Sequence, residues 1–199
     1  METLWGRRSL DLDSNGLKQR LTDYRHTLID LGTGDGRFVR CLAEKYTENF
    51  FIGIDACREN LRVNSQQKLP NALFIIASAQ ALPSELNGLA SRVCINFPWG
   101  SLLESLLKDD AALMNGLSGI ARPQAAMEIY LNGEALRTAG WTLEAGTDQI
   151  EGVLNASGWT TTSLACLDAI ALRSFSSTWA KRLAFGRDPR AVQLKFKKV

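Results

Sequence analysis

The chain has few of the residues that covalent catalysis, disulfide frameworks and membrane spans require. One histidine, His26, occurs among 199 residues, which makes a Ser–His or Cys–His hydrolytic pair improbable. The four cysteines are isolated and lack metal-ligand spacing, so we expect reduced, buried thiols and no metal site: Cys41, Cys57, Cys94 and Cys166. No apolar run reaches the ~18–20 residues of a membrane span and no signal peptide begins the chain, so we expect a cytoplasmic protein with no membrane partner.

The composition is that of an ordinary soluble globular protein, with 45% hydrophobic and 22% charged residues. The length predicts one domain over 1–199, too short for a separate recognition domain. The net charge of +2 is unevenly distributed, because residues 173–199 contain eight basic residues and one acid. This basic C-terminal segment within the domain has the electrostatic character of a phosphate-binding surface. A solvated basic tail is an equally good interpretation of the charge alone.

Apolar runs alternate with helical patterns along the chain, as in a doubly wound sheet. Residues 1–24 read as a short hairpin followed by a helix, and 132–146 as an irregular excursion. Strands are predicted at 27–31, 50–55, 72–77, 92–97, 125–131, 159–167 and 191–197, and helices at 37–46, 57–67, 83–89, 101–120 and 149–157. The predicted fold is a single-domain, Rossmann-like α/β fold with a seven-stranded, mostly parallel sheet, helices on both faces and the N-terminal hairpin.

A glycine-rich turn follows the first core strand, in the sequence IDLGTGDGR over 29–37. A strand that ends in such a turn and continues as a helix lets backbone N–H groups approach a ligand closely. Asp55 ends the next apolar run, 19 residues after Gly36. An open α/β sheet places a carboxylate there to bind the hydroxyls of a ribose. The two features predict a nucleoside site, with a purely structural turn as the alternative.

Asp30 immediately precedes the turn, and this position bears on which nucleoside binds. A carboxylate there would repel a pyrophosphate. S-adenosylmethionine has no phosphate and brings an ammonium and a sulfonium group, for which an acid is favourable. The order acid-x-G-x-G-x-G, with Asp55 after the next strand, resembles class I S-adenosylmethionine-dependent methyltransferases.

The fourth core strand ends in a second motif, INFPWG over 95–100. Pro98 fixes its φ and stops the strand, and Gly100 lets the chain turn, so Trp99 is held at a loop tip. An exposed indole there could stack a planar methyl acceptor, worth roughly 1–3 kcal/mol for a base. Capping of the core is the alternative role for Trp99.

Trp179 begins a basic stretch, followed by Arg182 and then Arg187. Such an aromatic residue could stack a base while the guanidinium groups hold phosphates. Amphipathic packing of Trp179, Leu183 and Phe185 against the sheet is the competing interpretation.

The segments IDLGTGDGR, FIGID, INFPWGSLLE and SSTWAKRLAFGR closely resemble the bacterial 16S rRNA (adenine(1408)-N1)-methyltransferases, known for aminoglycoside resistance. The resemblance runs over nearly the whole chain, and its FPWG and WAKRLAFGR motifs are more specific than the glycine turn. It implies S-adenosylmethionine as cofactor and 16S rRNA within the 30S subunit as partner. The implied cofactor residues are Asp30, Gly32, Gly34, Asp55, Ala79, Gln80 and Ser177. The implied catalytic residues are Trp99 and Trp179, which would sandwich a flipped adenine, and Pro98; the implied RNA-binding residues are Lys181, Arg182, Arg187 and Arg190.

The chemistry implied by the resemblance needs no dedicated base, because adenine N1 is unprotonated near neutral pH and can attack the sulfonium methyl directly. Catalysis then depends on extruding the base and aligning it. Four features depart from the family pattern: residues 64–71 hold a single lysine, Lys68, in place of a lysine cluster; the excursion after the fifth strand is short; Gln80 replaces a frequently acidic position; and Asp188 interrupts the basic run. Each lost phosphate contact would weaken RNA binding. We expect a monomer that acts on the assembled subunit.

Three other functions remain open at this point. The sequence NFPW over 96–99 resembles the N-P-P-aromatic motif of adenine-N6 methyltransferases, in which the Asn accepts a hydrogen bond from the exocyclic amine. The proline–tryptophan loop also resembles that of tRNA guanine-N7 methyltransferases. A ribosome-associated module that binds the cofactor without turnover is the third.

Overall fold

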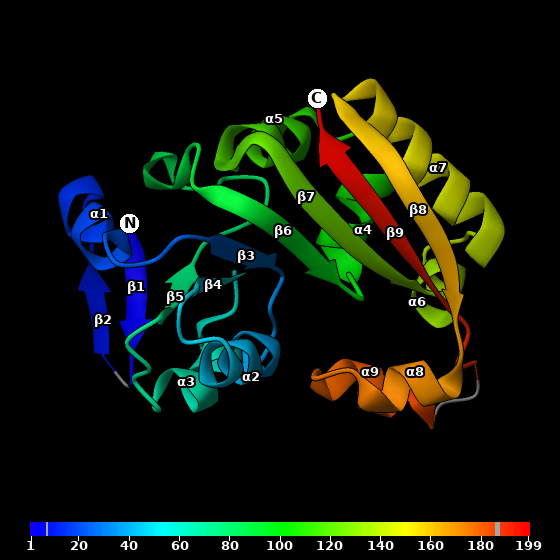
Figure 1. Cartoon of the computed structure of the whole chain (residues 1–199). Helices are drawn as coiled ribbons and strands as arrows, with labels where there is room; N and C mark the ends of the chain where they lie inside the picture. Colours follow the sequence, from blue (N-terminus) through cyan, green and yellow to red (C-terminus); the bar gives the residue numbers. More distant parts are fainter. Residues whose placement is uncertain (7, 186–187) are drawn as a thin grey trace.

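Nine strands form one mixed sheet in the computed structural model, which describes residues 1–6, 8–185 and 188–199. Their order is β2-β1-β5-β4-β3-β6-β7-β9-β8 (Figure 1). The strands are β1 Glu2–Trp5, β2 Arg8–Asp11, β3 Thr27–Leu31, β4 Phe50–Asp55, β5 Ala72–Ile76, β6 Ala90–Asn96, β7 Ala121–Asn132, β8 Trp159–Leu167 and β9 Ala191–Lys198. The five central strands, β5 to β7 in this order, run parallel, and both edges are antiparallel. All seven predicted core strands are confirmed.

The predicted N-terminal hairpin forms, but it is part of the sheet. Strand β1 pairs with β5 through Thr3 and Leu4, opposite Ile75 and Phe74, and Leu4 is buried. The predicted count of seven was therefore two strands short, because the apolar side of the hairpin covers the β5 edge.

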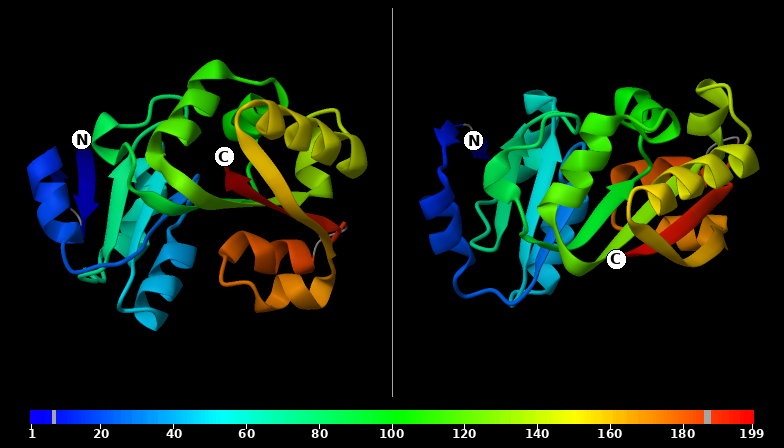
Figure 2. Two further views of the ribbon diagram at one scale, coloured as in Figure 1. Left: turned by 45° about the horizontal axis from the view of Figure 1, so that its top comes forward. Right: turned by 90° about the horizontal axis from the view of Figure 1, so that it is seen from above.

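Helices cover both faces of the sheet (Figure 1 and Figure 2). One face packs against α1 Ser14–Leu21, α4 Gly100–Leu107, α5 Ala111–Ile120 and α7 Leu143–Ala156. The other face packs against α2 Arg37–Lys45 and α3 Arg58–Ser65, while α8 Ala169–Ser174 and α9 Thr178–Ala184 lie farther along that face, beside the end of β6. The segment 168–185 thus reaches the glycine-turn side of the molecule although it follows β8 at the far edge.

Three predicted elements between the strands were wrong. The helix expected at 101–120 is two helices, α4 and α5, because Asp109 adopts φ 55° and Asp110 caps α5 by accepting from the Leu113 N–H at 2.9 Å. The helix expected at 83–89 is only a 3-10 turn, Ser84–Leu86.

The excursion expected at 132–146 is largely helical. It contains α6 Gly133–Thr138 and the start of α7. Asn132 caps α6 and Thr142 caps α7, each accepting from a backbone N–H three residues on, at 3.1 Å. The glycines of this segment suggested an irregular loop, whereas its two capping residues decide the structure.

The cysteines are free, and the prediction that they are buried holds only for Cys94. Cys57 and Cys166 are exposed, because Cys57 lies in the turn before α3 and Cys166 lies on the edge strand β8. Among the described residues, no helix combines the length and apolarity that crossing a bilayer requires.

Candidate active site

A cavity of 310 Å³ lies at the carboxyl ends of β3, β4, β5 and β6. Strand β3 has its sequence successor β4 on one side and β6 on the other, so this edge is a topological switch point, where open α/β sheets bind ligands. The cavity is lined by four strand-end loops and by three helices. The loops contribute Gly32 and Gly34, Asp55 and Ala56, 77–80 and 96–99, and the helices contribute Asn60 of α3, Ser101 and Leu102 of α4, and Trp179 of α9.

A larger hollow, of 610 Å³, lies at the opposite edge of the sheet around His26 and Arg92. The described residues that line it include none of the predicted site residues. Its position at the amino ends of parallel strands argues against it as the ligand site, and the smaller cavity is the better candidate.

Each glycine of the turn is required for its own reason. Gly32, Gly34 and Gly36 all have positive φ, at 72°, 59° and 73°. A Cβ on Gly32 would lie 2.6 Å from Leu102, and one on Gly36 would lie 2.4 Å from Phe74. A Cβ on Gly34 would meet nothing within 4 Å. The first and last glycines therefore allow close packing, while Gly34 leaves the cavity open.

Asp55 stands on the cavity wall and is held by the backbone. Its Oδ2 accepts from the Gly34 N–H at 2.8 Å and its Oδ1 from the Cys57 N–H at 2.9 Å. These bonds fix the carboxylate at the end of β4, and each oxygen keeps acceptor capacity for a ligand. The structure places Gly32, Gly34 and Asp55 together in the lining, as the sequence predicts.

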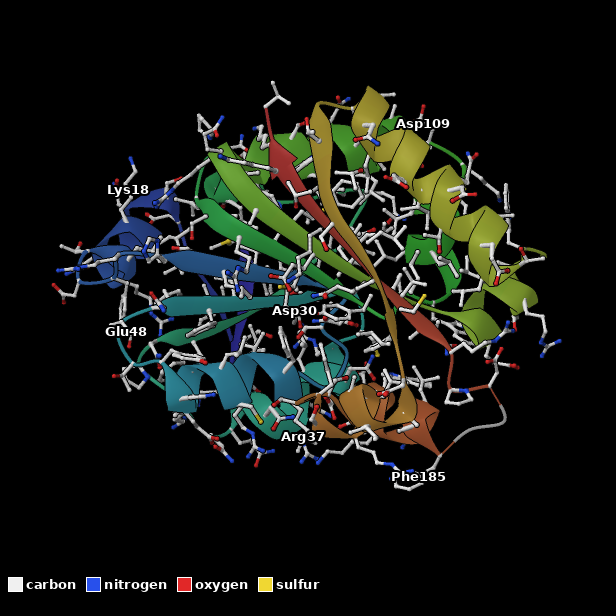
Figure 3. The ribbon with its side chains drawn as sticks, turned by 45° about the vertical axis from the view of Figure 1, so that its right-hand side comes forward. Lys18, Asp30, Arg37, Glu48, Asp109 and Phe185 are labelled. Atoms are coloured by element: carbon white, nitrogen blue, oxygen red, sulfur yellow. The ribbon has the colours of Figure 1, made fainter. Side chains whose placement is uncertain are left out.

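Asp30 lies among the central strands of the sheet (Figure 3). Its side chain is 1% exposed and is not part of the cavity lining. Its Oδ2 accepts from Thr33 Oγ1 at 2.5 Å and its Oδ1 from Asn96 Nδ2 at 2.7 Å. Burial raises the pKa of Asp30 to about 7, against the lowering effect of these two bonds. Direct contact of Asp30 with a cofactor stays a prediction, whereas its support of the turn is observed.

The loop after β5 forms another wall of the cavity. Ala79 and Gln80 both line it, and the Gln80 side chain donates to Ser105 Oγ at 2.8 Å, which fastens the loop to α4. Ser177 immediately precedes α9 and does not belong to the lining.

The indoles of Trp99 and Trp179 face each other across the mouth of the cavity. Their ring centroids are 6.3 Å apart, the rings are within 11° of parallel, and the residues are 48% and 49% exposed. This separation is at the long end of the range for aromatic pairs. It is close to twice the base-stacking distance, about 7 Å, that one base held between two rings requires.

A strained residue sets the position of Trp99. Phe97 has φ 54°, unusual for a bulky residue, and packs against Tyr130 and Phe175 with centroids 5.8 and 5.5 Å away. Pro98 follows and also lines the cavity. The loop that presents Trp99 is therefore locked to the same aromatic cluster that holds the segment before α9.

The basic residues predicted to bind RNA differ in their surroundings. Lys181 and Arg182 are exposed on α9, and the Arg182 guanidinium covers the Trp179 ring at 5.5 Å. Arg190 is paired with Asp188 at 2.9 Å and lies 3.9 Å from Glu144. Arg187 lies outside the described residues.

Two site contacts were not predicted from the sequence. Asn96 holds Asp30, and its own Oδ1 is buried without a partner in the described part of the chain. Thr178 of α9 donates to Asp35 of the glycine turn at 2.7 Å. The NFPW motif singles out Asn96, but no local sequence pattern could predict the Thr178–Asp35 bond, because these residues are 143 positions apart.

Comparison with known proteins agrees with this geometry. The family model described as 16S rRNA (adenine(1408)-N(1))-methyltransferase matches residues 2–198. The chain belongs to this family. The Escherichia coli 16S rRNA (adenine(1408)-N(1))-methyltransferase is 34% identical, over 94% of each chain.

Solved structures of methyltransferases share the fold of this family member. The aminoglycoside resistance methyltransferase NpmB1 superposes with a TM-score of 0.82 at 31% identity, over 100% of this chain and 99% of that one. A variant of the 16S rRNA (adenine(1408)-N(1))-methyltransferase from Catenulisporales acidiphilia, crystallised with the cosubstrate SAM, superposes with a TM-score of 0.86 over 100% and 97% of the two chains. At 24% identity this second likeness concerns the fold alone. The predicted class I methyltransferase fold is confirmed.

Proposed function

We propose that this chain transfers the methyl group of S-adenosylmethionine to N1 of adenine 1408 of 16S rRNA in the 30S subunit, and thereby confers aminoglycoside resistance. We further propose that it acts as a cytoplasmic monomer. The observation that carries the proposal is the parallel pair of half-exposed indoles at the mouth of a nucleoside-sized cavity, in a chain that belongs to this methyltransferase family.

The lining of the cavity suits a methyl donor without phosphates. None of the described residues that line it is Lys or Arg, and it contains one carboxylate, Asp55. A pyrophosphate would find no side-chain cation in this lining, whereas a ribose hydroxyl can donate to the Asp55 carboxylate. S-adenosylmethionine supplies an activated methyl group on a sulfonium centre.

In this proposal one set of residues binds S-adenosylmethionine and another set binds the acceptor adenine. Asp55 accepts the ribose hydroxyls, Gly34 lets the ligand approach the backbone, and Ala79 and Gln80 flank the donor's adenine. The buried Asp30 supports the turn from beneath through Thr33 and Asn96. Ser177 stands just outside the described lining, at the start of α9, and in this proposal it contacts the methionine part once the donor is bound.

Trp99 and Trp179 hold the extruded adenine, and the Pro98 backbone lies near its exocyclic amine. The N1 lone pair forms the new N–CH₃ bond as the CH₃–S bond breaks, so no residue has to remove a proton. The methylated base is a cation, which the faces of the two indoles stabilise. Alignment of N1 with the CH₃–S bond is the main contribution of the protein.

Lys181, Arg182 and Arg187 hold rRNA phosphates around the flipped nucleotide in this proposal. Arg190 is less available for phosphates than Lys181 and Arg182, because its guanidinium already binds Asp188.

The test is transfer of labelled methyl groups from S-adenosylmethionine to purified 30S subunits and, in parallel, to tRNA, followed by nucleoside analysis. We expect 1-methyladenosine in 16S rRNA and no label in tRNA. N6-methyladenosine, 7-methylguanosine in tRNA, or subunit binding without transfer would each support one of the alternative functions and contradict the proposal.

A further inference from the structure

The helix that carries Trp179 is packed at its first turn through one small buried residue, Ala180. Helix α9 is seven residues long, and the Trp179 indole is half exposed, so core packing alone does not fix the ring. Ser177 occupies the capping position, but its side chain makes no capping hydrogen bond. Arg182 covers one face of the indole and belongs to the same helix, so it cannot set the position of the helix.

The anchor at this end comes from the glycine turn. Thr178, the first residue of α9, donates from Oγ1 to Asp35 Oδ2 at 2.7 Å, in a partly buried position. Thr178 directly precedes Trp179, and Asp35 lies between Gly34 and Gly36. One charged hydrogen bond therefore joins the turn beside the donor cavity to the helix that forms its mouth.

Asp35 is itself firmly held, which makes it a suitable fixed point. Its Oδ1 accepts from the Arg37 N–H at 3.1 Å, at the start of α2, and its backbone carbonyl accepts from Asn64 of α3. Phe38 and Phe175 stack with centroids 5.4 Å apart, so the start of α2 also lies beside the segment before α9. Figure 3 shows Arg37, at the start of α2, close to the orange helices α8 and α9.

We infer that Asp35 and Thr178 are positioning residues, which set Trp179 parallel to Trp99 at the spacing that accepts one base. Phe175 and the apolar side of α9 hold this segment against the sheet. The Asp35–Thr178 bond then fixes the position of the start of α9 relative to the glycine turn. The inference rests on the proposed function for its catalytic consequence, but the geometry it describes does not require rRNA.

The test compares Thr178→Val, which keeps the shape of the side chain and removes the donor, with Thr178→Ser, which keeps the donor. Thr138→Val is the matched control, because the exposed Thr138 Oγ1 also donates a hydrogen bond, to the Glu134 backbone carbonyl, and Thr138 is not in the cavity lining. Loss of a charged hydrogen bond should lower the methylation rate of Thr178→Val about tenfold. S-adenosylhomocysteine affinity, measured by calorimetry, should change by less than about twofold.

A spectroscopic readout separates positioning from general damage. The protein is labelled with fluorotryptophan, and the Trp179 resonance is assigned with Trp179→Phe. In Thr178→Val we expect this resonance to broaden or split, with Trp5, Trp141 and Trp159 unchanged, and Thr178→Ser and Thr138→Val should match the wild type. Asp35→Asn, which keeps an acceptor without the charge, should give an intermediate spectrum.

Three results would overturn the inference: an unchanged Trp179 resonance in Thr178→Val, equal changes at all tryptophans, or a loss of donor affinity as large as the loss of rate. If wild-type protein failed to methylate 30S subunits, the proposed function would fail, while the fluorine spectra would still decide whether the bond positions Trp179.

Discussion

Trp99 and Trp179 keep about half of their surface in water, while Trp159, on strand β8, is 1% exposed. Leaving apolar area exposed forgoes roughly 25 cal/mol for each Å² that could be buried. We propose that a ligand completes the burial of these two parallel indoles beside the cavity. In this proposal the facing indoles of Trp99 and Trp179 form the two walls of a binding site for one planar base.

Replacing either indole should separate acceptor binding from donor binding. We expect Trp99→Ala and Trp179→Ala each to lower methylation of 30S subunits at least about tenfold, the loss of about one stacked base. S-adenosylhomocysteine affinity, measured by calorimetry, should be largely kept.

Trp5→Ala is the matched control for these variants, because Arg20 covers the Trp5 ring at 4.9 Å on the distant hairpin, much as Arg182 covers Trp179. This variant should keep full activity. Intact turnover in both cavity variants would show that the indoles do not hold the base.

Asp30 should make stability depend on pH. Its folded-state pKa of about 7 lies above its ordinary value of 3.8, so the folded protein binds more protons than the unfolded chain between these values. Stability therefore falls as pH rises from about 4 to about 7, by on the order of 3–4 kcal/mol from this group.

Asp30→Asn should remove that part of the pH dependence. The Asn96 amide can rotate so that its unpartnered Oδ1 accepts from the new amide, which keeps the packing intact. The measurement is urea unfolding of both proteins between pH 4 and 8. Parallel pH profiles for the two proteins would contradict the assignment.

At the scale of elements, the glycine turn can be tested at the one position where a side chain would enter the cavity. Gly34→Ala should cost about 1–2 kcal/mol in stability through its φ of 59°, and its methyl group should abolish or strongly weaken donor binding.

Gly88→Ala is the control for the glycine turn, since Gly88 has φ 67°, equally open space, and no place in the cavity lining. It should show the same loss in thermal denaturation and bind S-adenosylhomocysteine normally. Equal donor affinity in the two variants would mean that the ligand does not approach Gly34.

Helix α9 should contribute to the salt dependence of subunit binding. Neutralising Lys181 or Arg182 with Gln should weaken 30S binding and reduce the slope of log affinity against log salt by about 0.7–0.9 for each lost phosphate contact. Arg190→Gln should change the slope less, because Asp188 already neutralises this guanidinium. Filter binding at several salt concentrations measures the slopes, and equal effects at all three positions would contradict this distinction.

The elements also show how far local sequence reaches. The glycine turn, Asp55 and the FPWG loop were predictable because each is a short run of neighbouring residues at the end of a predicted strand. The break between α4 and α5 depends on the left-handed conformation of Asp109. A Gly or Asn at this position would have been a clearer sequence signal for that conformation. The burial of Asp30 could not be predicted, because its orientation depends on Asn96 from another strand.

Seen as a whole, the molecule brings residues from both ends of the chain to one edge of the sheet. The donor cavity belongs to β3–β6, in the first half, whereas α9 comes from the segment between β8 and β9 at the far edge. The antiparallel pair β8–β9 returns the chain to the side of α2, and Asp35 meets Thr178 there. The sequence named both tryptophans, but only the tertiary structure shows them 6.3 Å apart.

The central claim is that these two indoles hold one adenine of the small subunit beside a methyl donor. Primer extension on 16S rRNA, extracted from 30S subunits incubated with the protein and S-adenosylmethionine, tests it most directly. We predict a stop one nucleotide before adenine 1408, which disappears without the donor and is at least about tenfold weaker with Trp99→Ala or Trp179→Ala. No stop at that position, or a stop of full strength with both variants, would contradict the claim.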